Sequence, residues 1–324
     1  MKIVDIYARL KKDLNHIEKE LDRSVRSDHV QLSETSLHLL KAGGKRLRPV
    51  FVLLSGQFGR YDMDKLKNIA VSMELIHMAS LVHDDVIDDA DTRRGQPTVR
   101  AKWDNRVAMY TGDYIFARAL EVITQLPDPR IHRSMSSALV EMSIGEMEQI
   151  RLFFHSGQRV RDYLLRIKRK TALLIAVSCQ LGALAAEAGD VISSKLYQYG
   201  YYVGMAFQIR DDVLDLSGTE EQIGKPPGSD IRQGNITLPV IYALREENLN
   251  VELLTEIERI QAADGQTDIS RFLELVLTSR GVQCAEALAE RYIQKAIQVL
   301  APLPAGRHKD DLIRIAHFVG NRSY

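Results

Sequence analysis

Two short acidic runs carry the strongest chemical signal in the sequence: Asp84-Asp85-Val86-Ile87-Asp88 and Asp211-Asp212-Val213-Leu214-Asp215. The first and last aspartates of each run are four residues apart, so they lie on one face of a helix. Each run follows a strongly apolar stretch, where an unpaired carboxylate is costly. Oxygen ligands without nearby cysteines favour Mg²⁺ or Mn²⁺ over Zn²⁺. For one run alone a solvated helix end is the alternative, but the repetition favours a metal site.

Basic residues supply the complementary charge. Residues 41–48 surround a double glycine with lysines and arginines, directly before a helix that Pro49 opens. The free N–H groups and positive dipole of such a helix start suit a phosphate, although a solvated basic loop is the alternative. Neither GxxxxGK[ST] nor GxGxxG occurs, so a P-loop or dinucleotide-binding fold is not supported. The separated acidic and basic groups indicate two bound anions and more than one metal ion.

Helical periodicity dominates the elements that must position these groups. It extends over 3–24, 31–41, 66–86, 104–126, 130–154, 159–187 and 190–216, and four or five more helices follow between about 238 and 321. No stretch shows strand alternation with hairpin turns. Residues 217–239 form the one long irregular stretch, and such loops are often functional lids. We expect an all-α single domain over 1–324, with an N-terminal amphipathic helix at 1–24 and an active-site loop at 217–239.

The composition excludes several classes of function. Lys+Arg and Asp+Glu both number 43, so bulk attraction to nucleic acid is not expected. Cys179 and Cys284 are far apart and lack CxxC spacing, which favours reduced thiols and a cytoplasmic location. The N-terminus shows no signal-peptide pattern, and the most hydrophobic window, 172–186, is too short to span a membrane.

The motif set, in its order along residues 40–240, resembles that of the trans-prenyltransferases, the chain-elongating isoprenyl diphosphate synthases. The matching segments are the two acidic runs, Gly43-Gly44-Lys45-Arg46-Leu47-Arg48-Pro49, Arg93-Arg94-Gly95, Lys170-Thr171 and Gln208. The resemblance implies a helical bundle of the isoprenoid synthase type with a central cavity between helices. It also implies ionisation of an allylic diphosphate, attack by isopentenyl diphosphate and loss of a proton to give a trans double bond. The implied cofactor is Mg²⁺, three ions per site, with Mn²⁺ as an alternative.

The same resemblance assigns roles to matching residues. The metal ligands would be Asp84, Asp88 and Asp211, and the further catalytic residues would be Asp85, Asp212, Asp215 and Lys170. Isopentenyl diphosphate would be bound by Lys45, Arg48, His77 and Arg94. The allylic diphosphate would be bound by Arg93, Lys170, Thr171, Gln208 and Lys225. For His77, a buried core histidine is the alternative. The departing diphosphate would accept the proton.

Product length in this family is set by a tunnel whose floor lies five residues before the first acidic run. That position is Ala79, with Ser80 beside it and Ile76 and Met73 one and two turns deeper. These residues leave the tunnel open, so we expect a long all-trans product. The expected product is heptaprenyl diphosphate, a precursor of menaquinone side chains.

Within the family, the chain is most similar to catalytic components of two-component synthases. This implies a heterodimer with a small regulatory subunit, contacted through helices such as 104–126; a homodimer is the alternative. A peripheral membrane contact for product release remains open. Ser229 and Asn235 stand where many relatives have lysines, so the 217–239 loop carries less positive charge.

Other functions remain as alternatives to this expectation. They are a homomeric hexaprenyl, octaprenyl or solanesyl diphosphate synthase, a weakly active scaffold subunit, and a terpene cyclase. The motif around Gly43-Gly44 argues against the cyclase, which needs no isopentenyl diphosphate site.

Overall fold

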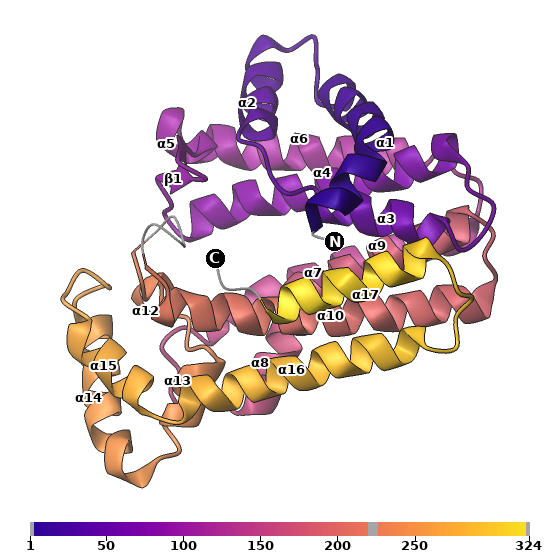
Figure 1. Cartoon of the computed structure of the whole chain (residues 1–324). Coiled ribbons are helices and arrows are strands. Elements are labelled where there is room, and N and C mark those ends of the chain that lie inside the picture. Colours follow the sequence, from indigo (N-terminus) through magenta and orange to yellow (C-terminus); the bar gives the residue numbers. More distant parts are fainter. Residues whose placement is uncertain (1–2, 220–225, 322–324) are drawn as a thin grey trace. The chain divides into compact units, whose positions relative to one another are not determined.

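The computed structural model describes residues 3–219 and 226–321 (Figure 1). Nearly all regular structure in this part of the chain is helical, which confirms the predicted all-α class. The first helices are α1 (Ile3–Ser24), α2 (Val30–Lys41), α3 (Leu47–Gly56), α4 (Met63–Ile87), α5 (Val99–Lys102), α6 (Asn105–Ile123) and α7 (Pro129–Arg151). There follow α8 (Val160–Ile167), the π-helix η1 (Lys168–Ala172), α9 (Leu173–Ala185) and α10 (Asp190–Ser217). The last are α12 (Ser229–Arg232), α13 (Leu238–Ala243), α14 (Glu247–Ala262), α15 (Ser270–Thr278), α16 (Gly281–Leu300) and α17 (Arg307–Gly320).

Three details differ from the predicted elements. The helix expected over 159–187 is divided into α8, η1 and α9, because a π-helical turn interrupts it. The loop after the first acidic run contains a two-residue antiparallel hairpin, β1 (Thr92–Arg93) and β2 (Gln96–Pro97). The short helix α12 lies inside the irregular stretch predicted over 217–239.

Internal contacts divide the chain into two compact units. Unit 1 comprises Met1–Ser136, Leu174–Gly200 and Pro302–Arg314, and unit 2 comprises Ser137–Leu173, Tyr201–Ala301 and Ile315–Tyr324. Helices α7, α10 and α17 each contribute residues to both units. The single domain expected over 1–324 stays a prediction.

Unit 1 is built around α4, which is buried along most of its length. Asp62 caps its start by accepting hydrogen bonds from the backbone N–H groups of Asp64 and Lys65. A helix that is apolar on nearly every side must be surrounded by other elements. Accordingly α4 packs against α1, α3, α5 and most extensively α6. The amphipathic helix α1 buries its apolar face here, at Ile6, Leu10, Ile17 and Leu21.

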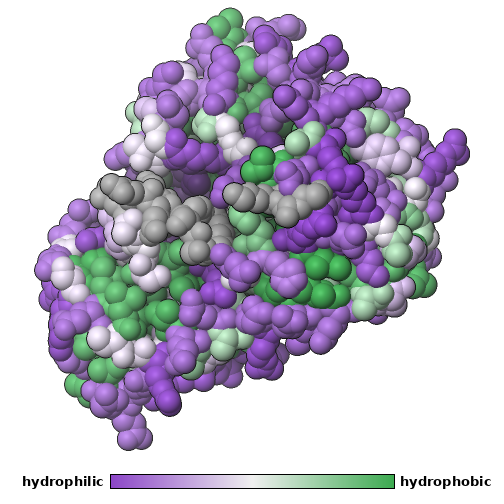
Figure 2. Space-filling view, viewed as in Figure 1, coloured by the Kyte–Doolittle hydropathy of each residue, from purple (hydrophilic) through white to green (hydrophobic). Residues whose placement is uncertain are grey.

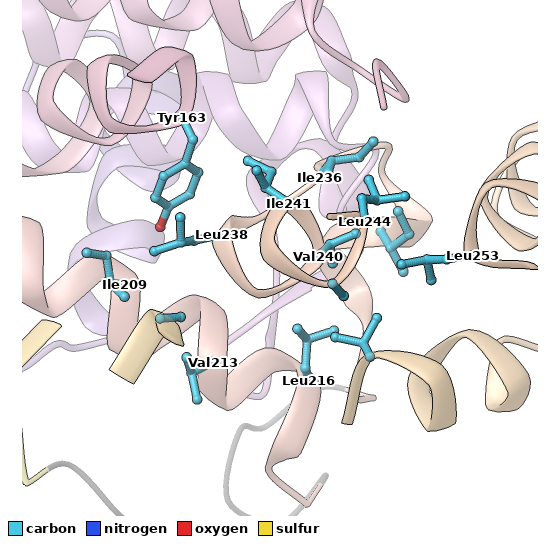
Figure 3. Close-up of a cluster of buried hydrophobic side chains, with 14 of the residues drawn as sticks. Tyr163, Ile209, Val213, Leu216, Ile236, Leu238, Val240, Ile241, Leu244 and Leu253 are labelled. Atoms are coloured by element: carbon cyan, nitrogen blue, oxygen red, sulfur yellow. The ribbon is translucent and has the colours of Figure 1, made fainter. Parts of the chain in front are cut away.

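Unit 2 has its own hydrophobic cluster, to which α8, α10 and α13–α16 contribute (Figure 3). Hydrophilic residues cover most of the face in Figure 2, and hydrophobic ones gather over the α13–α15 part of this unit. Among the described residues, none of the helices has the length and apolar character needed to cross a membrane. The second acidic run ends the buried part of α10, as the first ends α4.

Candidate active site

The first acidic run lies at the carboxyl end of α4, in unit 1. Asp84 and Asp88 are half-buried, whereas Asp85 is only 1% exposed. The Asp85 carboxylate accepts hydrogen bonds from Arg93, with 2.8 Å to Nε and 2.6 Å to Nη2. Burial raises the pKa of Asp85, and the Arg93 guanidinium opposes that shift. Arg93, predicted to bind the allylic diphosphate, is therefore an internal partner of the motif in this structure.

The loop after the motif is held by a residue that the sequence analysis did not single out. Arg100 lies 2.9 Å from an Asp89 oxygen and 3.1 Å from an Asp91 oxygen. Asp89 and Arg94 both have positive φ, 48° and 54°, which is the left-handed region. Three acidic residues followed by two basic ones over 88–94 were the only sequence signal that this loop is held by ion pairs.

A basic cluster forms around the double glycine of unit 1. A Cβ atom on Gly44 would lie 2.6 Å from Arg94 Nη1, so only glycine admits this guanidinium so close to the loop. Nε of Arg48 is buried and has no hydrogen-bond partner among the described residues. Burial, with Arg94 nearby, lowers the pKa of Arg48 to about 10 despite the attraction of Glu74. Burial and the arginines also hold the pKa of His77 well below its usual value.

Arg46 turns away from this cluster and pairs with acids inside unit 1. Its Nη1 lies 3.1 Å from Glu74 Oε1, and its Nε lies 2.5 Å from Glu18 Oε1. The backbone of Arg46 is left-handed, with φ 47°, which allows this turn at the start of α3. Glu74 is 2% exposed. It is the one carboxylate in the largely apolar run 69–76, a sequence signal to which no role was assigned.

The structure thus brings together, within unit 1, the residues predicted to bind isopentenyl diphosphate. Arg48, His77 and Arg94 share one electrostatic environment, in which Arg46 and Glu74 also take part. Lys45 belongs to the same loop, where its carbonyl accepts a hydrogen bond from Tyr7. Such a cluster, with a buried and unpartnered arginine nitrogen, suits an anion.

The predicted product-length residues lie on α4. Met73, Ile76 and Ala79 are fully buried. Ser80 is half-buried and donates a hydrogen bond to the His77 carbonyl over 2.9 Å. Because interiors are closely packed, a larger side chain at Ala79 must displace its neighbours or project into a cavity.

The second acidic run lies in unit 2, and its three aspartates differ in exposure. Asp211 is exposed, whereas Asp212 and Asp215 are each 3% exposed. Asp212 accepts hydrogen bonds from Tyr163 Oη and Gln208 Nε2, both over 2.7 Å. Burial, reinforced by Asp230, raises the pKa of Asp212 to about 8. Asp215 accepts a hydrogen bond from the Asp230 backbone N–H, at the start of α12.

Lys170 and Thr171, both predicted to bind the allylic diphosphate, lie on the π-helix η1. Thr171 donates a hydrogen bond to Gln208 Oε1 over 2.6 Å, which joins two predicted contacts directly. Lys170 Nζ lies 3.1 Å from Glu146 Oε2. Single π-helical turns occur often at functional sites. Lys225, the fifth residue of this group, lies outside the described residues.

The carboxylates fit Mg²⁺ on chemical grounds. No three His, Cys, Asp or Glu side chains of the described residues lie close enough to hold a metal ion by themselves. Mg²⁺, however, is usually bound by one or two carboxylates together with substrate phosphates and waters. Asp84 and Asp88, one helical turn apart and partly exposed, supply such a pair without a soft ligand beside them.

Comparison with known proteins assigns this chain to a family. The polyprenyl synthetase profile matches residues 29–276. The chain is 52% identical over 324 residues to heptaprenyl diphosphate synthase component 2 of Bacillus subtilis, covering 100% of this chain and 92% of that protein. The crystal structure of heptaprenyl diphosphate synthase from Staphylococcus aureus matches with a TM-score of 0.90 at 38% identity, covering 97% of this chain and 98% of that one.

A second solved structure extends the likeness beyond heptaprenyl synthases. The polyprenyl synthase of Caulobacter crescentus, complexed with calcium and isoprenyl diphosphate, matches with a TM-score of 0.93 at 30% identity. The match covers 99% of this chain and 98% of that one. The resemblance noted from the motifs is thereby confirmed, and the chain belongs to the polyprenyl synthetase family.

Proposed function

We propose that this chain is the catalytic subunit of a Mg²⁺-dependent heptaprenyl diphosphate synthase. It condenses isopentenyl diphosphate with an allylic diphosphate, farnesyl diphosphate or longer, to give an all-trans product for menaquinone side chains. The observation that carries the proposal is the 52% identity over the whole chain to component 2 of the Bacillus subtilis enzyme. The intact acidic runs and basic cluster support it, since a scaffold subunit needs neither.

The chemistry follows from charge. The bond between the allylic carbon and its diphosphate breaks, and diphosphate leaves with the electron pair. The double bond of isopentenyl diphosphate then forms the new carbon–carbon bond, and the departing diphosphate takes the released proton. Bound at Asp84, Asp88 and Asp211, Mg²⁺, three ions per site, would supply Lewis-acid stabilisation of the leaving diphosphate. Thr171, Gln208, Lys170 and Arg93 would orient that diphosphate.

The basic cluster of unit 1 would bind isopentenyl diphosphate without metal. Arg48 and Arg94 offer guanidinium forks that match phosphate oxygens. A neutral His77, favoured by its lowered pKa, can donate one hydrogen bond without adding to the cationic charge. The negative charge of Glu74 would attract these arginines and keep them in place before the substrate binds.

Ala79 provides the test of product length. Ala79→Phe places a large ring at a fully buried position of α4, and we expect shorter prenyl products. The matched control is Ala289→Phe on α16, also fully buried but in unit 2. Overpacking should destabilise either variant by about 1–3 kcal/mol, but only the first should shorten the product. Products are resolved by chain length, and an unchanged length for Ala79→Phe contradicts the assignment.

The partner is tested with labelled isopentenyl diphosphate, farnesyl diphosphate and Mg²⁺, with and without extract of the host cell. As component 2 of a two-component enzyme, the chain should incorporate label weakly alone and strongly with extract. Full activity alone would instead favour a homodimeric hexaprenyl, octaprenyl or solanesyl diphosphate synthase. No incorporation under either condition contradicts the prenyltransferase proposal.

A further inference from the structure

A chain of three hydrogen bonds, one buried and two part-buried, involves the second acidic run. Thr171 donates to Gln208 Oε1, Gln208 Nε2 donates to one Asp212 oxygen, and Tyr163 donates to the other. All four residues belong to unit 2. The two donors to Asp212 are neutral groups, and with its Nε2 directed at Asp212 the Gln208 amide presents Oε1 to Thr171.

Tyr163 is the member of this chain that the motifs do not account for. The side chain is fully buried, and its ring lies in the hydrophobic cluster of unit 2. Figure 3 shows the hydroxyl pointing from this cluster toward the helix that carries Ile209 and Val213. Phenylalanine would pack the same apolar surroundings, so the distinctive contribution of tyrosine is the hydrogen bond to Asp212.

Arg166, one turn further along α8, ties the same helix to a second segment. It is 4% exposed, and its guanidinium lies 5.5 Å from the centre of the Tyr163 ring. Its Nη2 donates to the Ile236 carbonyl over 2.9 Å. Helix α8 is therefore connected both to Asp212 on α10 and to the segment after α12.

The backbone of η1 and α10 brings Thr171 close to Gln208. The π-helical turn η1 contains one more residue than an α-helical turn, which rotates the preceding residues by roughly 100° relative to α9. A Cβ atom on Gly204 would lie 2.5 Å from the Cα atom of Ala172, so glycine permits α10 to approach η1 at this point. This close approach leaves Thr171 within hydrogen-bonding distance of Gln208.

We propose that Tyr163 is a positioning residue for the Mg²⁺ and allylic diphosphate contacts of unit 2. By holding Asp212 inward, its hydroxyl sets the rotation of the last turns of α10, and neighbouring side chains on a helix point about 100° apart. The exposed Asp211 is thereby directed outward, and the Gln208 amide is presented to Thr171 in one orientation. The inference rests on the proposed function for the identity of the ligands.

The test compares two buried tyrosines. Tyr163→Phe removes the hydroxyl that reaches Asp212, and Tyr199→Phe removes one that donates to the Leu312 carbonyl in unit 1. Both positions are fully buried, so the two variants should lose similar thermal stability. Only Tyr163→Phe should raise the Mg²⁺ concentration for half-maximal rate and the KM for farnesyl diphosphate, each by about 10-fold, because residues that support a metal site without binding the ion have effects of that size. The KM for isopentenyl diphosphate should stay within about twofold in both.

Binding without turnover provides an independent measurement. Inorganic diphosphate with Mg²⁺ should raise the melting temperature of the wild type and of Tyr199→Phe, and raise that of Tyr163→Phe less. Asp212→Ala should reproduce the Tyr163→Phe pattern, and the double variant should be no worse than Asp212→Ala, since the Tyr163 hydroxyl then has no acceptor left to lose. Equal shifts for the two tyrosine variants, or additive effects, overturn the positioning role.

These outcomes separate the two proposals. If the wild type binds Mg²⁺ and diphosphate but makes no prenyl product even with host extract, the proposed function fails while the positioning role stands or falls on the melting shifts. If the wild type elongates farnesyl diphosphate and the tyrosine variants behave alike, only the role of Tyr163 is lost.

Discussion

The two acidic motifs have the same spacing, but they hold their middle aspartate in different ways. Asp85 in unit 1 and Asp212 in unit 2 are both buried. The partner of Asp85 is the charged Arg93, which is 29% exposed as a side chain. The partners of Asp212 are the neutral groups of Tyr163 and Gln208. One motif is therefore fixed by a charge pair near solvent, and the other by hydrogen bonds in the interior.

This difference matters because the two kinds of support respond to different conditions. A partly exposed ion pair weakens as salt screens it. Hydrogen bonds from buried neutral donors are insensitive to salt, but losing one leaves a buried carboxylate oxygen without a partner, which costs about 1–3 kcal/mol. The support of Asp85 in the first motif should therefore weaken as ionic strength rises. The support of Asp212 in the second motif should depend instead on the packing of α8.

The largest expected effect falls equally on both motifs. Asp84→Asn and Asp211→Asn each remove a carboxylate proposed to hold Mg²⁺, and we expect each to lower turnover by about 10³-fold, since groups that stabilise developing charge have effects of this order. Incorporation of labelled isopentenyl diphosphate at saturating Mg²⁺ measures it. Asp190→Asn, which alters an exposed carboxylate, serves as the control and should retain activity. A large loss at only one motif would show that the two do not share the metal-binding role.

Loss of a partner for Asp85 should have the next largest effect. Arg93→Gln leaves a buried carboxylate without its cation, and we expect unfolding free energy to fall by about 2–3 kcal/mol, less than for a fully buried pair. The loss should shrink at high salt, where the wild-type pair is already weakened. Urea unfolding at low and high salt measures both. Arg23→Gln, in an exposed pair with Glu20, should change stability by less than about 0.5 kcal/mol.

The smallest effects are those of pH, and they differ in sign between the units. The pKa of His77 is lowered in the folded state, so its contribution to stability is complete above about pH 6.5 and is lost as the pH falls. The pKa of Asp212 is raised, so its contribution is present at low pH and is lost as the pH rises. Without metal, the free energy of unfolding should rise with pH below pH 6.5 because of His77, and His77→Asn should remove up to about 1.4 kcal/mol per pH unit of that slope. Asp212 should make the free energy of unfolding fall as the pH rises, and Asp212→Asn should remove that negative slope.

Unfolding midpoints measured from pH 4.5 to 8 in the presence of chelator test this prediction. Wild type, both single variants and the double variant are needed, because the two contributions oppose one another below pH 6.5. If the two single substitutions change the pH dependence of stability in the same direction, one of the two pKa shifts is assigned wrongly.

The sequence was sufficient for the main helices and for the motifs that depend on residue type and spacing. The periodicity located α4 and α10, and the acidic runs at their ends followed from residue type and spacing. The double glycine predicted a phosphate site, which stays a prediction, and in the structure Arg94 approaches the backbone there, at Gly44. These features are encoded within short segments, so they can be found before the fold is known.

Features that depend on distant partners could not be found in this way. Nothing around Tyr163 indicates that its hydroxyl meets a residue 49 positions later. Of the basic residues near the double glycine, Arg46 turns inward because Glu18 and Glu74 lie there, and both are 28 positions away. The π-helical turn at 168–172 also lacked a signal, because the surrounding periodicity continues on either side.

The π-helical turn limits which deletions and crossovers the sequence can tolerate. Deleting one residue from 168–172 would restore continuous α-helix but would rotate Lys170 and Thr171 away from their present partners, Glu146 and Gln208. Sequence gaps should therefore be absent from this segment in active relatives. For the same reason, chimeras between related enzymes should inherit η1 and the 200–217 part of α10 from one parent, because a crossover between them would combine two surfaces that were never selected together.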